Sequence, residues 1–131
     1  MNIPAIHAVM AETQTSQLTF PGVVRRLMEV GVESYFCAAA AMQETFYLRD
    51  GQTHTAKMML PHLPIAEEFS KEGIVAAVRG AQNDTIRYPE FMRQATAVVV
   101  IAYWAYLTGR KVVYFGRKGE MHTEDFPGAK P

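Results

Sequence analysis

The stretch from Glu44 to Lys57 reads ETFYLRDGQTHTAK and decides the fold class. Asp-Gly separates two runs rich in β-branched and aromatic residues, and this dipeptide is the strongest short-range signal for a two-residue hairpin loop. Such a loop sets the register, so Tyr47 should face His54 and Glu44 should face Lys57, an oppositely charged pair. We therefore expect a β-hairpin whose side chains alternate between the two faces of a sheet.

Further strands are expected on either side of this hairpin. The run from Val32 to Ala39 is β-branched and aromatic at its start and favours a strand. Residues 111–115 and 120–125 predict a second hairpin, in which Gly119 takes the left-handed position of a type I turn. In that register Tyr114 lies opposite His122 and Val112 lies opposite Glu124.

Helical spacing predicts the remaining elements. A short helix is expected from Ile3 to about Glu12, and a second one begins at the N-cap Thr19 and ends at Gly31. Ser70 is the expected N-cap of a helix that runs to about residue 82.

The longest predicted helix opens at Pro89 and extends to about Leu107. Its polar face disappears in the second half, where Val100, Ile101 and Trp104 continue one apolar side. A helix that is apolar all round must be covered all round, so either the N-terminal helices or a second subunit should cover this end.

Together these elements predict a single α+β domain over residues 1–131, in the order helix, three strands, two helices, two strands. The sheet should be antiparallel with the helices mainly on one face. Residues 1–18 are expected to form a short helix or a flexible N-terminal segment, and residues 19–128 the core. We recognise no internal repeat.

Composition excludes several classes of protein. Thirteen basic residues balance thirteen acidic ones, so no basic surplus indicates nucleic-acid binding. The single cysteine, Cys37, cannot form an internal disulfide, and this favours a cytoplasmic location. The N-terminus lacks the features of a signal peptide, and the apolar run 95–107 is shorter than the roughly 20 residues of a membrane span.

The C-terminal third resembles a known family. The residues that carry the resemblance are the run from Tyr106 to Glu120, followed by His122, Glu124 and Phe126-Pro127-Gly128, with Arg87-Tyr88-Pro89 ahead of them. This pattern is similar to the YdfO-like family of small bacterial, often prophage-associated domains, sometimes labelled phage envelope proteins. The similarity extends from Phe20 to Gly128. It implies a one-domain α+β fold and association with phage, and it implies no activity, cofactor or catalytic residue.

No recognised motif for catalysis or metal binding is present. Cys37 lies mid-strand, where a small thiol packs as a hydrophobe. The four histidines, His7, His54, His62 and His122, lack the spacing of structural zinc sites, so we expect neither metal nor cofactor. His122 and Glu124 share one side of a strand, although polar residues alternating on a terminal hairpin are more often a solvated face.

One face of the predicted sheet remains a candidate site. If the helices cover the face that bears Phe46, Leu48, Val113, Phe115 and Met121, the opposite face carries Tyr47, His54, Tyr114 and His122. That face is either a solvated surface, a ligand groove or a subunit interface.

The first functional hypothesis is therefore a non-enzymatic, homodimeric interaction domain. Its interface would be this Tyr–His face or the stripe formed by Val100, Ile101 and Trp104, with Val112. The alternative is a small-molecule-binding protein or enzyme with Tyr47, His54, Tyr114 and His122 around a pocket. A phage or host protein is a further possible partner.

Overall fold

The computed structural model describes residues 1–127, so Gly128, the expected end of the core, lies outside the described residues. The elements are α1 (Ile3–Gln14), α2 (Phe20–Glu29), β1 (Val32–Ala38), β2 (Gln43–Leu48), β3 (Thr53–Lys57), α3 (Lys71–Gln82), α4 (Tyr88–Ala97), β4 (Ala102–Tyr106), β5 (Lys111–Phe115) and β6 (Met121–Asp125). The strands form one antiparallel sheet in the order β3-β2-β1-β4-β5-β6. The expected α+β class and antiparallel sheet are confirmed, with one more strand than predicted.

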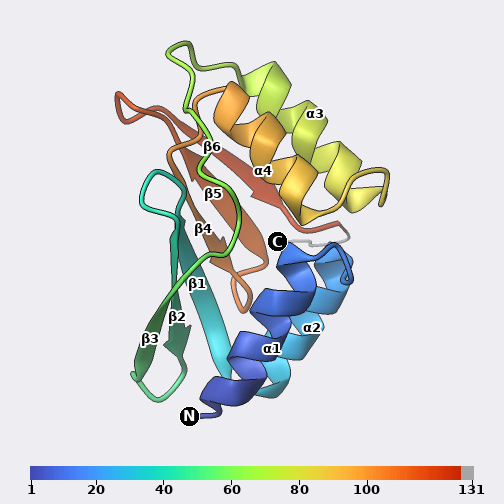
Figure 1. Cartoon of the computed structure of the whole chain (residues 1–131), viewed down its shortest axis with the longest axis vertical. Helices are drawn as coiled ribbons and strands as arrows, with labels where there is room; N and C mark the ends of the chain where they lie inside the picture. Colours follow the sequence, from blue (N-terminus) through green and yellow to red (C-terminus); the bar gives the residue numbers. More distant parts are fainter. Residues whose placement is uncertain (128–131) are drawn as a thin grey trace.

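The helices form two pairs, α1 with α2 and α3 with α4, which lie on the same side of the sheet (Figure 1). We call the sheet face beneath them the inner face and the opposite one the outer face. The core lies between the inner face and the helices, where Ile6, Leu27, Phe46, Ile74 and Met92 are almost completely buried. The N-caps Thr19 and Ser70 were expected, and each accepts a hydrogen bond from the backbone N–H three residues on.

The predicted long helix from Pro89 to Leu107 is wrong. Helix α4 ends at Ala97, and the chain re-enters the sheet as β4, which pairs with β1 on one side and with β5 on the other. The apolar character on all sides, which suggested a covered helix, instead belongs to a central strand. The β-branched run from Val98 to Ile101 makes the change of direction, and Val99 takes a positive φ of 75° within it.

The register predicted for the first hairpin is also wrong, by one residue on β3. Leu48 donates its N–H to the carbonyl of Gln52 over 2.9 Å, and Gly51 has a φ of 91°, so the loop is a type I turn followed by a left-handed glycine. Phe46 therefore faces His54, and Lys57 faces Gln43 instead of Glu44. A one-residue slip moves the side chains of β3 to the other face.

The second hairpin has the predicted register, with Tyr114 opposite His122 and Val112 opposite Glu124. Its turn is of the same kind as the first, because Gly116 donates its N–H to the Glu120 carbonyl over 2.8 Å and Gly119 has a φ of 85°.

The chain is an internal duplication, contrary to the expectation that it holds no repeat. Each helix of the first half recurs 68 positions later, since α1 begins at residue 3 and α3 at 71, and α2 at 20 and α4 at 88. Strand β6 likewise repeats β3, from residues 53 and 121. Positive φ values recur at the same offset, in Ser16 and Asp84 and in Met42 and Arg110. Residues identical at this offset include the pairs Ile6/Ile74, Pro21/Pro89, Arg25/Arg93, Tyr35/Tyr103, Gly51/Gly119 and His54/His122.

The two halves meet at β1 and β4, the central strands, where Phe36 faces Trp104. Because these strands are antiparallel and equivalent, a pseudo-two-fold axis passes between them, perpendicular to the sheet. One helix pair lies on each side of that axis (Figure 1). Any pocket near the axis on the inner face is therefore bounded by both halves of the chain.

Candidate functional site

A cleft opens between the two helix pairs, above the central strands. It encloses a cavity with a volume of about 70 Å³ that is accessible to water. At about 10–15 Å³ per water, this is room for about five waters, or for a small organic molecule. The walls of the cavity come from all four helices or the loops beside them, and its floor comes from strands of both halves. The walls include Thr13, Phe20, Val23, Ala81, Arg87, Tyr88, Phe91 and Phe126. The floor includes Tyr35, Tyr103, Val112 and Tyr114.

The floor of the cleft is a cluster of aromatic rings. Tyr35 and Tyr103, equivalent residues in the duplication, have ring centroids 6.1 Å apart, and Tyr114 lies 5.8 Å from Tyr103. The hydroxyls of Tyr88 and Tyr103 share a hydrogen bond of 2.8 Å. Burial raises the pKa of these four tyrosines, so their hydroxyls stay neutral and can donate hydrogen bonds.

A buried carboxyl group, that of Glu44, lies on the inner face of β2, outside the residues that line the cavity. Its residue is 7% exposed, and no hydrogen bond joins its side chain to any of the residues 1–127. Burial raises its pKa to about 7, because an apolar environment disfavours the charged form. Its equivalent in the second half is Val112, so the duplicated scaffold accepts an apolar residue at this position.

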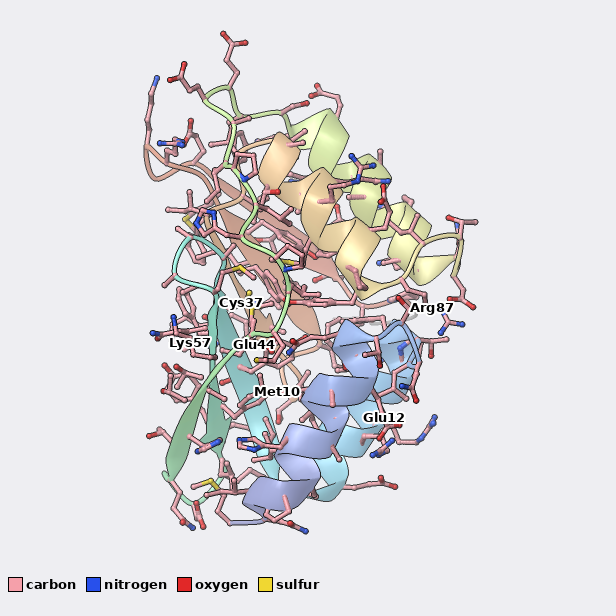
Figure 2. The ribbon with its side chains drawn as sticks, in the orientation of Figure 1. Met10, Glu12, Cys37, Glu44, Lys57 and Arg87 are labelled. Atoms are coloured by element: carbon pink, nitrogen blue, oxygen red, sulfur yellow. The ribbon has the colours of Figure 1, made fainter. Side chains whose placement is uncertain are left out.

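Cys37 on β1 is the cross-strand neighbour of Glu44 (Figure 2). The Cys37 Sγ lies 3.7 Å from the Tyr88 hydroxyl and 3.8 Å from the Met58 Sδ, and its residue is completely buried. Burial, followed by the nearby Glu44, raises the pKa of this thiol, so it does not form a thiolate nucleophile at neutral pH. The expected packing role of Cys37 agrees with this environment.

Two charged groups stand near the mouth of the cleft. Arg87 pairs with Asp84 and also donates to the backbone carbonyl of Ser16 over 3.0 Å, which ties the α3–α4 turn to the α1–α2 turn (Figure 2). Glu124 accepts from Arg79 over 2.8 Å and hydrogen-bonds His122 over 2.7 Å. Desolvation opposes ionisation of Glu124, but these two hydrogen bonds outweigh it and lower its pKa. Unlike Glu44, this carboxylate is already neutralised.

The four sequence-predicted ligand residues do not share a face. Tyr114 lines the cleft, and His122 lies next to it on the inner face. His54 is also on the inner face, but near α1, where its Nε2 is 2.8 Å from the Nε2 of His7. Tyr47 is on the outer face, one residue out of phase with Phe46. The expected common face is therefore wrong, because the first hairpin is shifted and β4 lies between the two hairpins.

Of the five residues expected beneath the helices, only two lie on the inner face. Phe46 and Leu48 point to the helices, whereas Val113, Phe115 and Met121 alternate onto the outer face. Among the predicted interface residues, Val100 and Val112 are buried by the chain itself, and Ile101 and Trp104 are half-buried.

Trp104 is the centre of an aromatic cluster on the outer face. Its ring stacks on Tyr47 and Tyr106, with centroids 5.4 and 5.5 Å away, and meets the edge of Phe36 at 5.1 Å. Its indole N–H is buried and has no hydrogen-bond partner among the described residues. Trp104, one residue of the predicted interface stripe, therefore lies on the outer face of a strand instead of on a helix.

The sequence reasoning missed Glu44, Tyr35, Tyr88 and Tyr103 as site residues. A signal for Glu44 was present: it alternates with Phe46 and Leu48, so it shares their inward face on β2. The predicted pairing with Lys57 concealed this, because it supplied the carboxylate with a partner. For the tyrosines, the signal was the 68-residue offset of the duplication, which makes Tyr35 and Tyr103 equivalent residues.

A protein-family model described as "Protein of unknown function (DUF1398)" matches residues 8–125. No curated protein matches the chain. Within residues 1–127, no helix is long and apolar enough to cross a membrane, and no three His, Cys, Asp or Glu side chains gather as a metal site would require.

Proposed function

From the premise that the chain belongs to this family of unknown function, we propose that it is a small-molecule-binding domain whose ligand occupies the cleft between the two helix pairs. The observation that carries the proposal is the cavity itself, with hydroxyls on its floor and walls from both halves. Protein interiors are close-packed, and voids larger than a water molecule are few. A roomy, largely apolar pocket with a few converging polar groups is the usual form of a ligand site.

Binding fits the chemistry of the site better than nucleophilic catalysis. The only thiol and the tyrosine hydroxyls hold their protons, because burial raises their pKa values. The groups that line the cleft are therefore suited to accommodate and orient a ligand.

A thermal-shift screen of small molecules tests this proposal, with two variants of helix α3. Ala81→Leu fills the cleft, where Ala81 is part of the lining, whereas Ala76→Leu adds the same atoms to an exposed position of the same helix. A ligand at 100 times its Kd stabilises the folded protein by about 2.7 kcal/mol. Hits should stabilise the unmodified chain and Ala76→Leu but not Ala81→Leu. A screen without hits, or hits that bind Ala81→Leu equally well, would refute it.

A second candidate function is self-association through the outer face, which Trp104 favours. A cluster of aromatic side chains on a half-buried sheet face is typical of a protein–protein interface. We propose a second copy of the chain as the partner. Lys57 and Asp125 are exposed on the outer face at equivalent ends of the two edge strands, so they lie at opposite sides of the pseudo-two-fold axis. Consider a second copy related by a two-fold axis that lies in the sheet plane, perpendicular to the line from Lys57 to Asp125. The two outer faces then meet, and Lys57 of each copy lies against Asp125 of the other. A phage or host protein on this face stays a prediction.

A further inference from the structure

We propose that the cleft selects uncharged molecules with an aromatic or apolar body and a hydrogen-bond acceptor, such as the carbonyl oxygen of a ketone or an amide, and that the Tyr114 hydroxyl donates to this acceptor. The inference rests on the proposed binding function and adds the chemical class of the ligand. Three observations carry it: an unpartnered hydroxyl on a buried lining residue, a phenylalanine at the equivalent position of the other half, and charged lining residues that are paired or turned outward.

The hydroxyl of Tyr114 is the first step. Tyr114 is 5% exposed and lines the cavity, and no hydrogen bond joins its hydroxyl to any of the residues 1–127. Within that same part of the chain, the Trp104 Nε1 is the only unpartnered side-chain nitrogen or oxygen that is closed off from solvent. The Tyr114 hydroxyl is therefore open to solvent, at the cavity that its residue lines. The hydroxyls of Tyr88 and Tyr103, by contrast, already bond each other.

The duplication shows that packing does not require this hydroxyl. Phe46 occupies the position of Tyr114 in the first half, and the two residues lie opposite the equivalent histidines His54 and His122. Phe46 is 2% exposed, so the scaffold buries the same ring without a hydroxyl. Phe46 is outside the cavity lining, whereas Tyr114 is part of it. Because a buried hydroxyl without a partner costs stability, its presence only at the cavity indicates a binding role.

The Tyr114 hydroxyl acts as a donor at neutral pH. Burial, followed by the nearby Glu124 carboxylate, raises the pKa of Tyr114, so the phenol keeps its proton. A ligand that fills the cleft displaces water from this donor. If the ligand offers no acceptor, the donor is left unpaired, at a cost of about 1–3 kcal/mol. The site therefore favours ligands that carry an acceptor.

A second donor lines the same cavity. The amide oxygen of Gln82 accepts from the Arg79 Nη1 over 3.1 Å, so the amide nitrogen, which has no acceptor among residues 1–127, is left to donate. Like the Tyr114 hydroxyl, it is complemented by an acceptor on the ligand.

The charged residues of the lining indicate that the ligand is uncharged. Arg87 already has an acidic partner and a backbone carbonyl, and Glu124 is held by Arg79 and His122. Asp125 alternates onto the outer face, so its carboxylate points away from the cavity. The lining therefore leaves no charge that would neutralise that of a ligand, and the burial of an unpaired charge is costly.

The experiment compares two probes of the same shape. Acetophenone carries a carbonyl oxygen, and α-methylstyrene replaces that oxygen with a CH₂ group. Binding of each is measured by NMR chemical-shift titration at pH 7 to the unmodified chain, to Tyr114→Phe and to Tyr106→Phe. Tyr106→Phe is the control, because it removes a hydroxyl from the outer face of the neighbouring strand, outside the cavity lining. Benzoate and benzamidinium serve as charged probes of similar size.

Tyr114→Phe should bind acetophenone about ten-fold more weakly than the unmodified chain does and α-methylstyrene within about two-fold as tightly, and Tyr106→Phe should change neither affinity. The unmodified chain should bind each charged probe about ten-fold or more weakly than acetophenone. An unchanged affinity of Tyr114→Phe for acetophenone, an equal loss for both neutral probes, or a charged probe that binds as tightly as acetophenone would overturn this inference and leave the cleft as a site for other ligands. No shift at the cleft residues with any of these probes would overturn both proposals.

Discussion

At the scale of single residues, Glu44 is a carboxyl group whose burial raises its pKa. Its carboxyl group is buried without a hydrogen bond among residues 1–127, and its pKa of about 7 lies above the ordinary value of 4.5. The folded chain therefore holds a proton that the unfolded chain releases at lower pH. Between these two pKa values the unfolded state binds fewer protons, so stability falls as the pH rises.

We predict that the free energy of unfolding decreases by about 3 kcal/mol between pH 4.5 and pH 8 through this residue, given about 1.4 kcal/mol per pKa unit. The groups that face Glu44 do not add to this change: the Cys37 thiol and the hydroxyls of Tyr35, Tyr88 and Tyr103 stay protonated throughout. Urea unfolding at pH 5 and pH 8 measures the difference. Glu44→Gln should remove most of it, while Glu33→Gln should keep it. An equally steep dependence in Glu44→Gln would show that other groups cause it.

At the scale of elements, the two hairpins depend on one glycine each. Gly51 and Gly119 have φ values of 91° and 85°, and an added Cβ would meet no atom within 4 Å at either position. A side chain at either position therefore lowers the free energy of unfolding through the strained left-handed backbone and not through a steric clash.

We predict that Gly51→Ala and Gly119→Ala each lower the free energy of unfolding by about 1–2 kcal/mol, the cost of a left-handed conformation for an L-residue. The two turns belong to opposite edges of the sheet, so the double variant should lose the sum of the two effects. Urea denaturation of the three variants measures this. A loss below about 0.5 kcal/mol at either site would mean that the turn changes its type.

At the scale of the whole molecule, the duplication organises both candidate surfaces. The cleft extends from Tyr35 and Tyr103, beside the pseudo-two-fold axis, onto β5 and β6 at the inner face, and the Trp104 cluster lies around the same axis at the outer face. The halves are similar in backbone and different in chemistry. At the 68-residue offset, Glu44 corresponds to Val112 and Cys37 corresponds to Ala105. Each half therefore supplies different chemical groups to a common framework.

For self-association, we predict that sedimentation equilibrium shows a dimer of the unmodified chain at tens of micromolar. Lys57→Asp and Asp125→Lys should each weaken the dimer, because each places like charges against each other across the interface. The double variant restores both pairs and should restore the dimer. A monomer in the unmodified chain would refute the proposal, and a double variant as weak as the single ones would refute this pairing of the two copies.

Parts of the site were beyond sequence reasoning for identifiable reasons. The Asp50-Gly51 signal correctly indicates a hairpin, but both a two-residue loop and a three-residue loop with a left-handed glycine satisfy it, and they differ by one residue in register. That difference decides whether His54 or Thr53 shares a face with Phe46. The run from Val98 to Tyr106 is apolar enough for a buried helix or for a central strand, and periodicity alone does not separate the two.

The sequence alone determined the α+β class, the antiparallel hairpins, the helix N-caps at Thr19 and Ser70, and the burial of Cys37, because each depends on local propensity or on a short turn motif. Only the tertiary structure decided that β4 joins two equivalent halves, that Tyr47 and Tyr114 lie on opposite faces, and that Glu44 is buried on the inner face. Those features depend on which strands become neighbours, and strand neighbours are chosen by contacts between residues far apart in the chain.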